Sequence, residues 1–263
     1  MEPLTDVREI SRIAYGFIAS KALFAALNLD VFGVLSGDGK TCADTASTAG
    51  IAESRMATLL AALINAGLVQ QDGERCKNAP ASERYLVRGA CAYFGDYYRF
   101  QIDRQMYPAL THLGPVLRGD AGEGLDFQAQ SDLMSDPAEA EAFSRAQHAG
   151  SLGPALVLDK KIDLSGRRSL LDVAGGSGAF SITLCRRYPE LHATILDFPN
   201  VVEVANRFIA EAGLEDRIAT VGGNAIQSEW PPAQDVILMS YLLSAVGEGR
   251  SEGRATKTAP PTA

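Results

Sequence analysis

The chain has 263 residues, of which 46% are hydrophobic and 21% charged, and its formal net charge is −8. This length allows two domains, and the composition is typical of a globular protein rather than a disordered one. The acidic balance argues against a general nucleic-acid-binding role, because phosphate backbones attract basic surfaces.

The four cysteines are scattered through the chain and form no C-x-x-C pair. They are typical of reduced thiols, so we expect no metal site. We find no apolar run that approaches membrane-spanning length and no signal-peptide profile. We therefore predict a cytoplasmic protein with no membrane partner.

The first ninety residues predict helices followed by a hairpin. Apolar residues recur at helical spacing from Val7 to Leu29. A second element opens at Thr41, and a third runs from Glu53 to Ala66, where Gly67 stands at a position that commonly ends a helix. Asp72-Gly73, between two short segments, is a strong hairpin signal. This order of elements is the layout of a winged helix.

A winged helix often binds DNA, so this alternative has to be weighed. The helix that would enter the groove, Glu53 to Ala66, carries Arg55 as its single cation. A major-groove reader needs several phosphate and base contacts from that helix. Its apolar residues predict a buried face. We therefore favour dimerisation and rank a DNA-binding regulator below it.

Two helical stretches follow the hairpin. The first runs from about Cys91 to Leu117 and is rich in aromatic residues. The second opens with Asp136-Pro137-Ala138-Glu139, which has the pattern of a capping box with proline at the first helical position, and continues to about Asp159.

Strands and helices then alternate, which predicts a parallel sheet with helices on its faces. The expected strands are 169–173, 193–196, 218–221 and 236–239, and the expected helices are 179–188 and 201–212.

The most informative segment joins the first of these strands to its helix. It reads Leu-Leu-Asp-Val-Ala-Gly-Gly-Ser-Gly-Ala-Phe over residues 170–180. A phosphate-binding P-loop needs Lys and then Ser or Thr after its last glycine, and the spacing also fits a dinucleotide fingerprint poorly. The pattern D-x-[G/A]-x-G-x-G fits at Asp172, Ala174, Gly176 and Gly178. Asp197 ends the next expected strand, where a carboxylate can accept hydrogen bonds from two ribose hydroxyls.

This pattern resembles motif I of the class I S-adenosylmethionine (SAM) methyltransferases. The segments 22–32 and 59–69 resemble the N-terminal dimerisation domain of small-molecule O-methyltransferases of the plant caffeate and bacterial hydroxyneurosporene type. The resemblance implies an α/β chain with a winged-helix dimerisation domain at 1–90, linking helices that line an acceptor pocket at 91–165, and a Rossmann-like SAM-binding domain with a mostly parallel sheet at 166–249.

The implied activity is SAM-dependent methyl transfer to a hydroxyl of an aromatic small molecule by a homodimer. The residues that would contact SAM are Asp172, Gly175, Gly176, Gly178, Asp197, Phe198, Asn224, Ala225, Ser240 and Ser151. Those that would line the acceptor pocket are Tyr98, Met106 and Tyr107.

The chain departs from the family pattern at two site positions. Asn224 stands where the family has an acid that contacts the adenine amine, although an Asn carbonyl can accept the same hydrogen bond. Ser244 stands where the plant members have the histidine that takes the proton of the acceptor hydroxyl. An unassisted serine is a poor general base. His148, on the second linking helix, is the best substitute.

The last segment, residues 250–263, contains no Val, Ile, Leu, Met or aromatic residue. It predicts a disordered tail, whereas the family sheet continues with further strands. We therefore expect a truncated or frameshifted methyltransferase that lacks its last strands. This leaves a second hypothesis, a non-catalytic family member that dimerises, with or without binding SAM.

Overall fold

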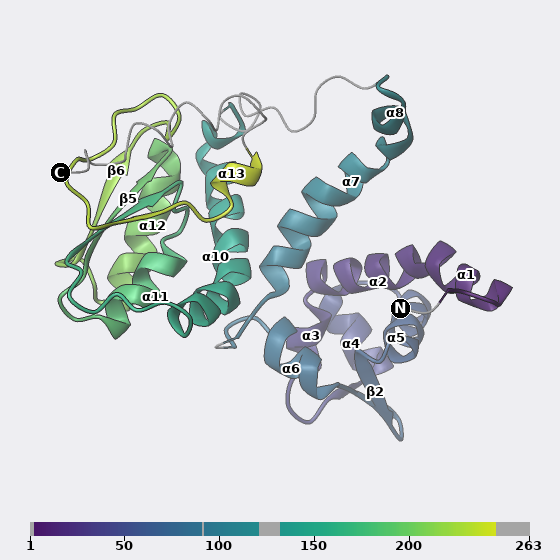
Figure 1. Ribbon diagram of the computed structural model, residues 1–263. Helices are drawn as coiled ribbons and strands as arrows, with labels where there is room; N and C mark the ends of the chain where they lie inside the picture. The colour runs from purple at the N-terminus through teal and green to yellow at the C-terminus, as the bar shows by residue number, and fades with distance from the viewer. Residues whose placement is uncertain (1–2, 91, 121–131, 246–263) are drawn as a thin grey trace. The chain divides into compact units, whose positions relative to one another are not determined.

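The computed structural model describes residues 3–90, 92–120 and 132–245. The chain forms two compact units, residues 1–110 and 111–263, and Figure 1 traces both. The predicted tail at 250–263 lies outside the described residues.

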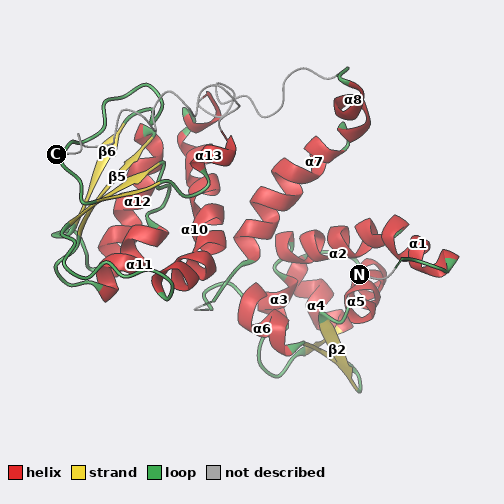
Figure 2. Ribbon diagram, viewed as in Figure 1, coloured by secondary structure: helices red, strands yellow, loops and turns green. Residues whose placement is uncertain are grey.

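The first unit is mainly helical and carries a small antiparallel sheet in the order β1-β3-β2. Figure 2 shows the predominance of helix. Its helices are α1 (Val7–Ala14), α2 (Gly16–Asn28), α3 (Val31–Val34), α4 (Cys42–Ala49), α5 (Glu53–Asn65), α6 (Pro80–Leu86), the π-helix η1 (Tyr97–Met106) and α7 (Tyr107–Leu110). Its strands are β1 (Lys40–Thr41), β2 (Val69–Asp72) and β3 (Arg75–Asn78). The hairpin predicted at Asp72-Gly73 is confirmed, since β2 pairs with β3 across it.

The core of this unit forms where α5 packs on its neighbours. Met56, Leu60 and Leu63 are buried on one face of α5, in the same cluster as Phe32 and Leu35. The prediction that the apolar face of this helix is buried is therefore confirmed.

The helical stretch predicted from Val7 to Leu29 is interrupted at Tyr15. This residue has ψ near 0° and is followed by Gly16, a poor helix former, so the chain restarts as α2. Helix α2 contributes Phe24, Ala26 and Leu27 to the core, whereas α1 buries no residue among those that the structure describes.

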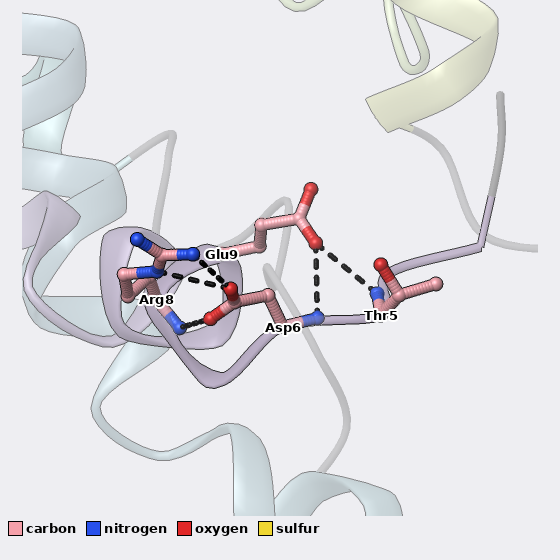
Figure 3. A network of polar contacts seen from close by, with 4 residues as sticks. All are labelled: Thr5, Asp6, Arg8 and Glu9. Atoms are coloured by element: carbon pink, nitrogen blue, oxygen red, sulfur yellow. Dashed lines mark hydrogen bonds and ion pairs between the residues drawn. The ribbon is translucent and has the colours of Figure 1, made fainter.

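Helix α1 is held instead by contacts at its own start (Figure 3). The Asp6 carboxylate accepts a hydrogen bond from the Arg8 backbone N–H at 2.8 Å and pairs with the Arg8 guanidinium. The Glu9 carboxylate accepts from the backbone N–H groups of Thr5 and Asp6, each at 3.1 Å. This reciprocal capping box satisfies N–H groups that a helix leaves free at its first turn.

Together, α1 and α2 correct one sequence-based expectation. The stretch Val7–Asn28 is long and apolar enough to cross a membrane by length and composition, with a mean hydropathy of 1.3. The expectation that no run approaches this length was therefore wrong. Core helices of soluble proteins pass the same test, and α2 contributes to the core of its unit.

The second unit contains an α/β sheet, as predicted. Its helices are α8 (Leu113–Arg118), α10 (Pro137–Asp159), α11 (Ala179–Arg187), α12 (Pro199–Ala212) and α13 (Leu242–Ala245). Its strands are β4 (Ser169–Val173), β5 (His192–Asp197), β6 (Ile218–Gly222) and β7 (Val236–Leu238). The predicted start of α10 is confirmed, because the Asp136 carboxylate accepts hydrogen bonds from the backbone of Ala138 and Glu139.

The four described strands are parallel and lie in the order β6-β5-β4-β7. Side chains alternate between two buried faces, as the period of a strand requires. Leu170 and Ile195 face a cluster that includes residues of α11 and α12. Leu171, Val173 and Leu196 face a smaller cluster. In Figure 1, α10, α11 and α12 lie beside one another next to the sheet.

Candidate functional site

The loop after β4 has the backbone geometry of a tight turn. Ala174, Gly176 and Gly178 all have positive φ, between 56° and 78°, a region that glycine adopts readily and alanine does not. The Ala174 backbone N–H donates to the Leu196 carbonyl at 2.8 Å and so ties the loop to β5. Helix α11 begins directly after Gly178. The strand, turn and helix predicted from the sequence are therefore confirmed.

Two of the glycines have different physical reasons to lack a side chain. A Cβ at Gly178 would lie 2.6 Å from Ile195 Cδ1, so this glycine allows the loop to pack on β5. A Cβ at Gly176 would meet no heavy atom within 4 Å. The loop is therefore open beside Gly176.

Asp172 lies beneath this loop and is 1% exposed. Its Oδ2 accepts a hydrogen bond from the Ser181 hydroxyl at 2.7 Å, whereas its Oδ1 has no partner among the described residues. A Cβ at Gly175 would lie 2.6 Å from Asp172 Cγ, so the carboxylate needs a glycine above it. Burial raises the pKa of Asp172 to about 6, and the neighbouring charge of Asp197 adds to the increase.

Asp197 ends β5 and is 9% exposed. Its two oxygens accept hydrogen bonds from the backbone N–H groups of Gly176 and Phe198, each at 2.7 Å. Burial raises the pKa of Asp197 to about 6, against the lowering effect of these two hydrogen bonds. An ionised carboxylate has about four acceptor sites, so two further donors can be accommodated.

The segment after β6 reaches the same edge of the sheet. The Gly223 N–H donates to the Asp197 carbonyl at 2.8 Å, which brings Asn224 close to the end of β5. Asn224 Oδ1 accepts from the Ile226 N–H at 2.9 Å, and Ala225 is buried. The Asn224 oxygen therefore already stabilises its own turn and retains one further acceptor site.

His148 lies on α10, and its ring packs on α12. The imidazole stacks on Phe208 with ring centroids 3.9 Å apart, and its Nδ1 lies 2.9 Å from the Ser177 hydroxyl of the glycine loop. Burial and the nearby cations Arg145 and Arg186 lower the pKa of His148 to about 4. Its imidazole is therefore neutral at physiological pH.

The other predicted site residues fall in three places. Ser151 lies one turn after His148 on α10 and is half-buried. Ser240 follows β7 and is also half-buried, and Ser244 lies in α13. The predicted pocket residues Tyr98, Met106 and Tyr107 belong to the first unit.

The three pocket residues have contacts of their own within that unit. Tyr98 packs against its core, and Tyr107 meets Phe24 edge to face beneath the Lys21 ammonium. The side chain of Met106 is exposed. Their role towards an acceptor stays a prediction.

Sequence reasoning missed the side chains that support the loop. Ser177 and Ser181 bond to His148 and Asp172, and Phe208 supplies the ring beneath His148. Ser177 could have been noted, because it is the one polar side chain among residues 174–178. Phe208 sits on α12, and no spacing in the sequence connects it with His148.

The arrangement has the character of a small-molecule site. The loop after β4, Asp197 after β5 and Asn224 after β6 meet at the carboxyl edge of a parallel sheet. The chain moves from β4 outward to β6 and then returns to the other side of β4, and ligands of open α/β sheets bind at such a reversal. Three features fit a polar, cationic ligand. They are the open space beside Gly176, the buried Asp172 Oδ1 that has no partner among the described residues, and the remaining acceptor sites of the Asp197 carboxylate. Among the described residues, no group of three or more His, Cys, Asp or Glu side chains could hold a metal ion.

Comparison with known protein families gives two matches. A model of an O-methyltransferase domain matches residues 122–247, and a model of an O-methyltransferase dimerisation domain matches residues 11–88.

Individual relatives agree with these models. The 3-hydroxy-5-methyl-1-naphthoate 3-O-methyltransferase of Streptomyces sahachiroi is 30% identical over 89% of this chain and 68% of its own length. The N,N-dimethyltransferase OxyT of Streptomyces rimosus is 28% identical over 92% of this chain and 71% of its own. Among solved structures, human N-acetylserotonin methyltransferase in complex with SAM has a TM-score of 0.85 at 22% identity, covering 99% of this chain and 79% of that one. This last likeness concerns the fold.

Proposed function

The chain belongs to the O-methyltransferase family, and from this premise we propose that it transfers a methyl group from SAM to a hydroxyl of an aromatic small molecule. The observation that carries the proposal is the meeting of the glycine loop and Asp197 at the carboxyl edge of the sheet. The aromatic acceptor is proposed by analogy with the naphthoate O-methyltransferase, the relative at 30% identity.

The residues of the site fit the parts of SAM. Asp197 would accept hydrogen bonds from both ribose hydroxyls, and Phe198, Asn224 and Ala225 would flank the adenine. The open side of the loop at Gly176 would admit the amino-acid end, above the buried Asp172. When bound, SAM supplies an electrophilic methyl group. The protein's main contribution is to orient that group towards the acceptor, since transfer is an in-line displacement.

The residue at the position of the family's general base favours a second candidate acceptor, an amine. Ser244 replaces the family's histidine, and the pKa of His148 is far below that of an effective base near neutral pH. A neutral amine carries its own lone pair and attacks without prior loss of a proton. The relationship to an N,N-dimethyltransferase favours this alternative over a non-catalytic chain. An acidic phenol that is already ionised would also need no base.

One assay separates these possibilities. The full chain is titrated calorimetrically with S-adenosylhomocysteine and then incubated with SAM and matched hydroxy- and amino-naphthoates. We expect binding, and a mass increase of one methyl group on the hydroxylated compound. Methylation of the amine alone would favour the second candidate. Binding without any methylation would support the non-catalytic hypothesis, and absence of binding would contradict a SAM site.

We further propose that the chain forms a homodimer through α1 and the start of α2. This surface exposes a row of apolar side chains at helical spacing: Val7, Ile10, Ile13 and Phe17, each more than half exposed. Exposed apolar side chains add no stability to a monomer, and patches of this kind mark interaction surfaces. The match to a dimerisation domain from residue 11 onwards supports a second copy of the chain as the partner.

Charge placed in this row tests the dimer. Light scattering should find a dimer for the native chain that persists at high salt, because hydrophobic burial is not screened. The double variant Ile10→Glu/Ile13→Glu should be monomeric. Arg12→Glu, on the opposite side of α1, should remain dimeric. A monodisperse native monomer would contradict the proposal.

A cytoplasmic location remains part of the proposal. Two features of α2 argue against its spanning a membrane. It contributes to the core of its unit, and it carries Lys21, whose ammonium lies 2.5 Å from the Asp103 carboxylate. Cell fractionation should recover the protein without detergent. Recovery only from the membrane fraction would contradict it.

A further inference from the structure

The glycine loop has one side chain that can form a hydrogen bond. Residues 174–178 read Ala-Gly-Gly-Ser-Gly, so Ser177 alone carries a polar side chain. That side chain is 3% exposed and points to His148 of α10, with Oγ 2.9 Å from the imidazole Nδ1. This hydrogen bond links a side chain of the loop to a helix outside the strand–turn–helix motif.

His148 is in turn fixed in place by α12. Its ring lies parallel to Phe208, within 5°, at a centroid distance of 3.9 Å. The two helices are also joined by an ion pair between Glu141 of α10 and Arg207 of α12, and Glu141 pairs in addition with Arg145 of its own helix. A ring held by stacking and by helix packing offers Ser177 a partner of defined position.

The same contacts make His148 unsuited to proton abstraction. Its Nδ1 is engaged by Ser177, and burial, followed by the cations Arg145 and Arg186, opposes a positive charge on the ring and lowers its pKa. A side chain so resistant to protonation accepts a proton poorly. The contacts favour a neutral hydrogen-bonding role.

We propose that His148 is a positioning residue: through Ser177 it holds the glycine loop in the shape that admits the amino-acid end of SAM. This proposal rests on the proposed function, since it assigns a role towards the same cofactor. The loop needs such support because its backbone includes a non-glycine residue, Ala174, at positive φ. That conformation is disfavoured for an L-residue and persists only where the surroundings fix it.

The test measures S-adenosylhomocysteine affinity of the full chain by calorimetry in a set of matched variants. His148→Leu and Ser177→Ala should each weaken binding roughly tenfold, the effect of losing one hydrogen bond. The double variant should be no weaker than either single one, because both remove the same link. His148→Asn, whose amide can replace Nδ1, should bind within about threefold of the native chain. His192→Asn, at an exposed histidine, should bind as the native chain does.

Hydrogen exchange of the loop amides provides a readout that needs no ligand. Exchange at residues 175–178 should accelerate in His148→Leu and stay slow in His148→Asn. Native affinity and native exchange in both His148→Leu and Ser177→Ala would overturn the inference, as would a fall in kcat with unchanged affinity, which indicates a base. If the native chain fails to bind S-adenosylhomocysteine while loop exchange still depends on His148, the proposed function fails and the loop link stands.

Discussion

The loop after β4 and helix α1 present opposite kinds of surface. At the loop, carboxylates and backbone N–H groups converge in a buried place, and several of them already bond to one another. On α1, one row of side chains is apolar and exposed, and a network of polar contacts lies at the first turn (Figure 3). The loop therefore suits the proposed binding of a small polar ligand, and the apolar row of α1 suits the proposed dimer contact.

The loop after β4 and helix α1 are also stabilised in different ways. The loop is positioned by the sheet, because the carboxyl ends of β4, β5 and β6 meet at one edge. Helix α1 buries nothing among the described residues and depends on its own hydrogen bonds. A substitution at the loop should therefore affect the whole second unit, and one at the α1 cap should act locally.

The largest expected effect on stability is its dependence on pH. The pKa of His148 is about 4 in the folded chain, against 6.5 for a free histidine, so the unfolded chain binds its proton first as pH falls. Stability present above pH 6.5 is then lost between pH 6.5 and about 4, by up to about 3 kcal/mol.

The difference in unfolding free energy between the native chain and His148→Asn isolates this effect. The stability advantage of the native chain over His148→Asn should fall by about 3 kcal/mol between pH 7 and pH 4. Asp172 and Asp197 act in the opposite direction in both proteins, since their raised pKa values favour folding below about pH 6. Parallel stability curves would contradict the burial of a neutral His148.

The next prediction compares a glycine of the loop after β4 with Gly16, which follows α1 and begins α2. Gly175→Ala places a Cβ against the Asp172 carboxylate and should destabilise the second unit by roughly 1–3 kcal/mol, as overpacking does. At Gly16 an added Cβ meets nothing within 4 Å, and alanine favours helix, so Gly16→Ala should be neutral or stabilising by up to about 1 kcal/mol. Thermal unfolding measures both. Equal melting temperatures for the two variants would contradict the difference in packing.

Cofactor affinity should also depend on pH. Asp197 has a pKa of about 6 in the chain without ligand, and its protonated form loses acceptor capacity for ribose hydroxyls. The affinity for S-adenosylhomocysteine should therefore fall about tenfold, or about 1.4 kcal/mol, between pH 7 and pH 5. Calorimetry at several pH values checks this, and an affinity that rises on acidification would contradict it.

The smallest expected change in stability comes from removing a helix cap. Asp136 caps α10, which has buried residues, so Asp136→Ala should lower the unfolding free energy by about 1 kcal/mol. Asp6 caps α1, so in the monomeric Ile10→Glu/Ile13→Glu background Asp6→Ala should speed hydrogen exchange within residues 7–14 and leave the melting temperature unchanged. An equal loss of melting temperature in both variants would show that α1 contributes to a core.

The sequence predicted what depends on short spacing. The turn at Ala174–Gly178, the carboxylate at Asp197 and the buried face of α5 follow from glycine pattern, strand ends and helical periodicity, and the structure has each of them. The break at Tyr15 was not predicted, because the apolar spacing continues through it. The pairing of His148 with Phe208 and Ser177 depends on how two helices and a loop pack, which no local pattern records.

We propose that SAM binds at the carboxyl ends of the strands beside Asp197, and calorimetry with S-adenosylhomocysteine tests this most directly. Asp197→Ala should weaken binding by about 2–4 kcal/mol, because two charge-assisted hydrogen bonds to the ribose are lost. Asp216→Ala removes an exposed carboxylate that precedes β6, at the opposite edge of the sheet, and should bind as the native chain does. Unchanged affinity in Asp197→Ala, with an unchanged melting temperature, would contradict the claim.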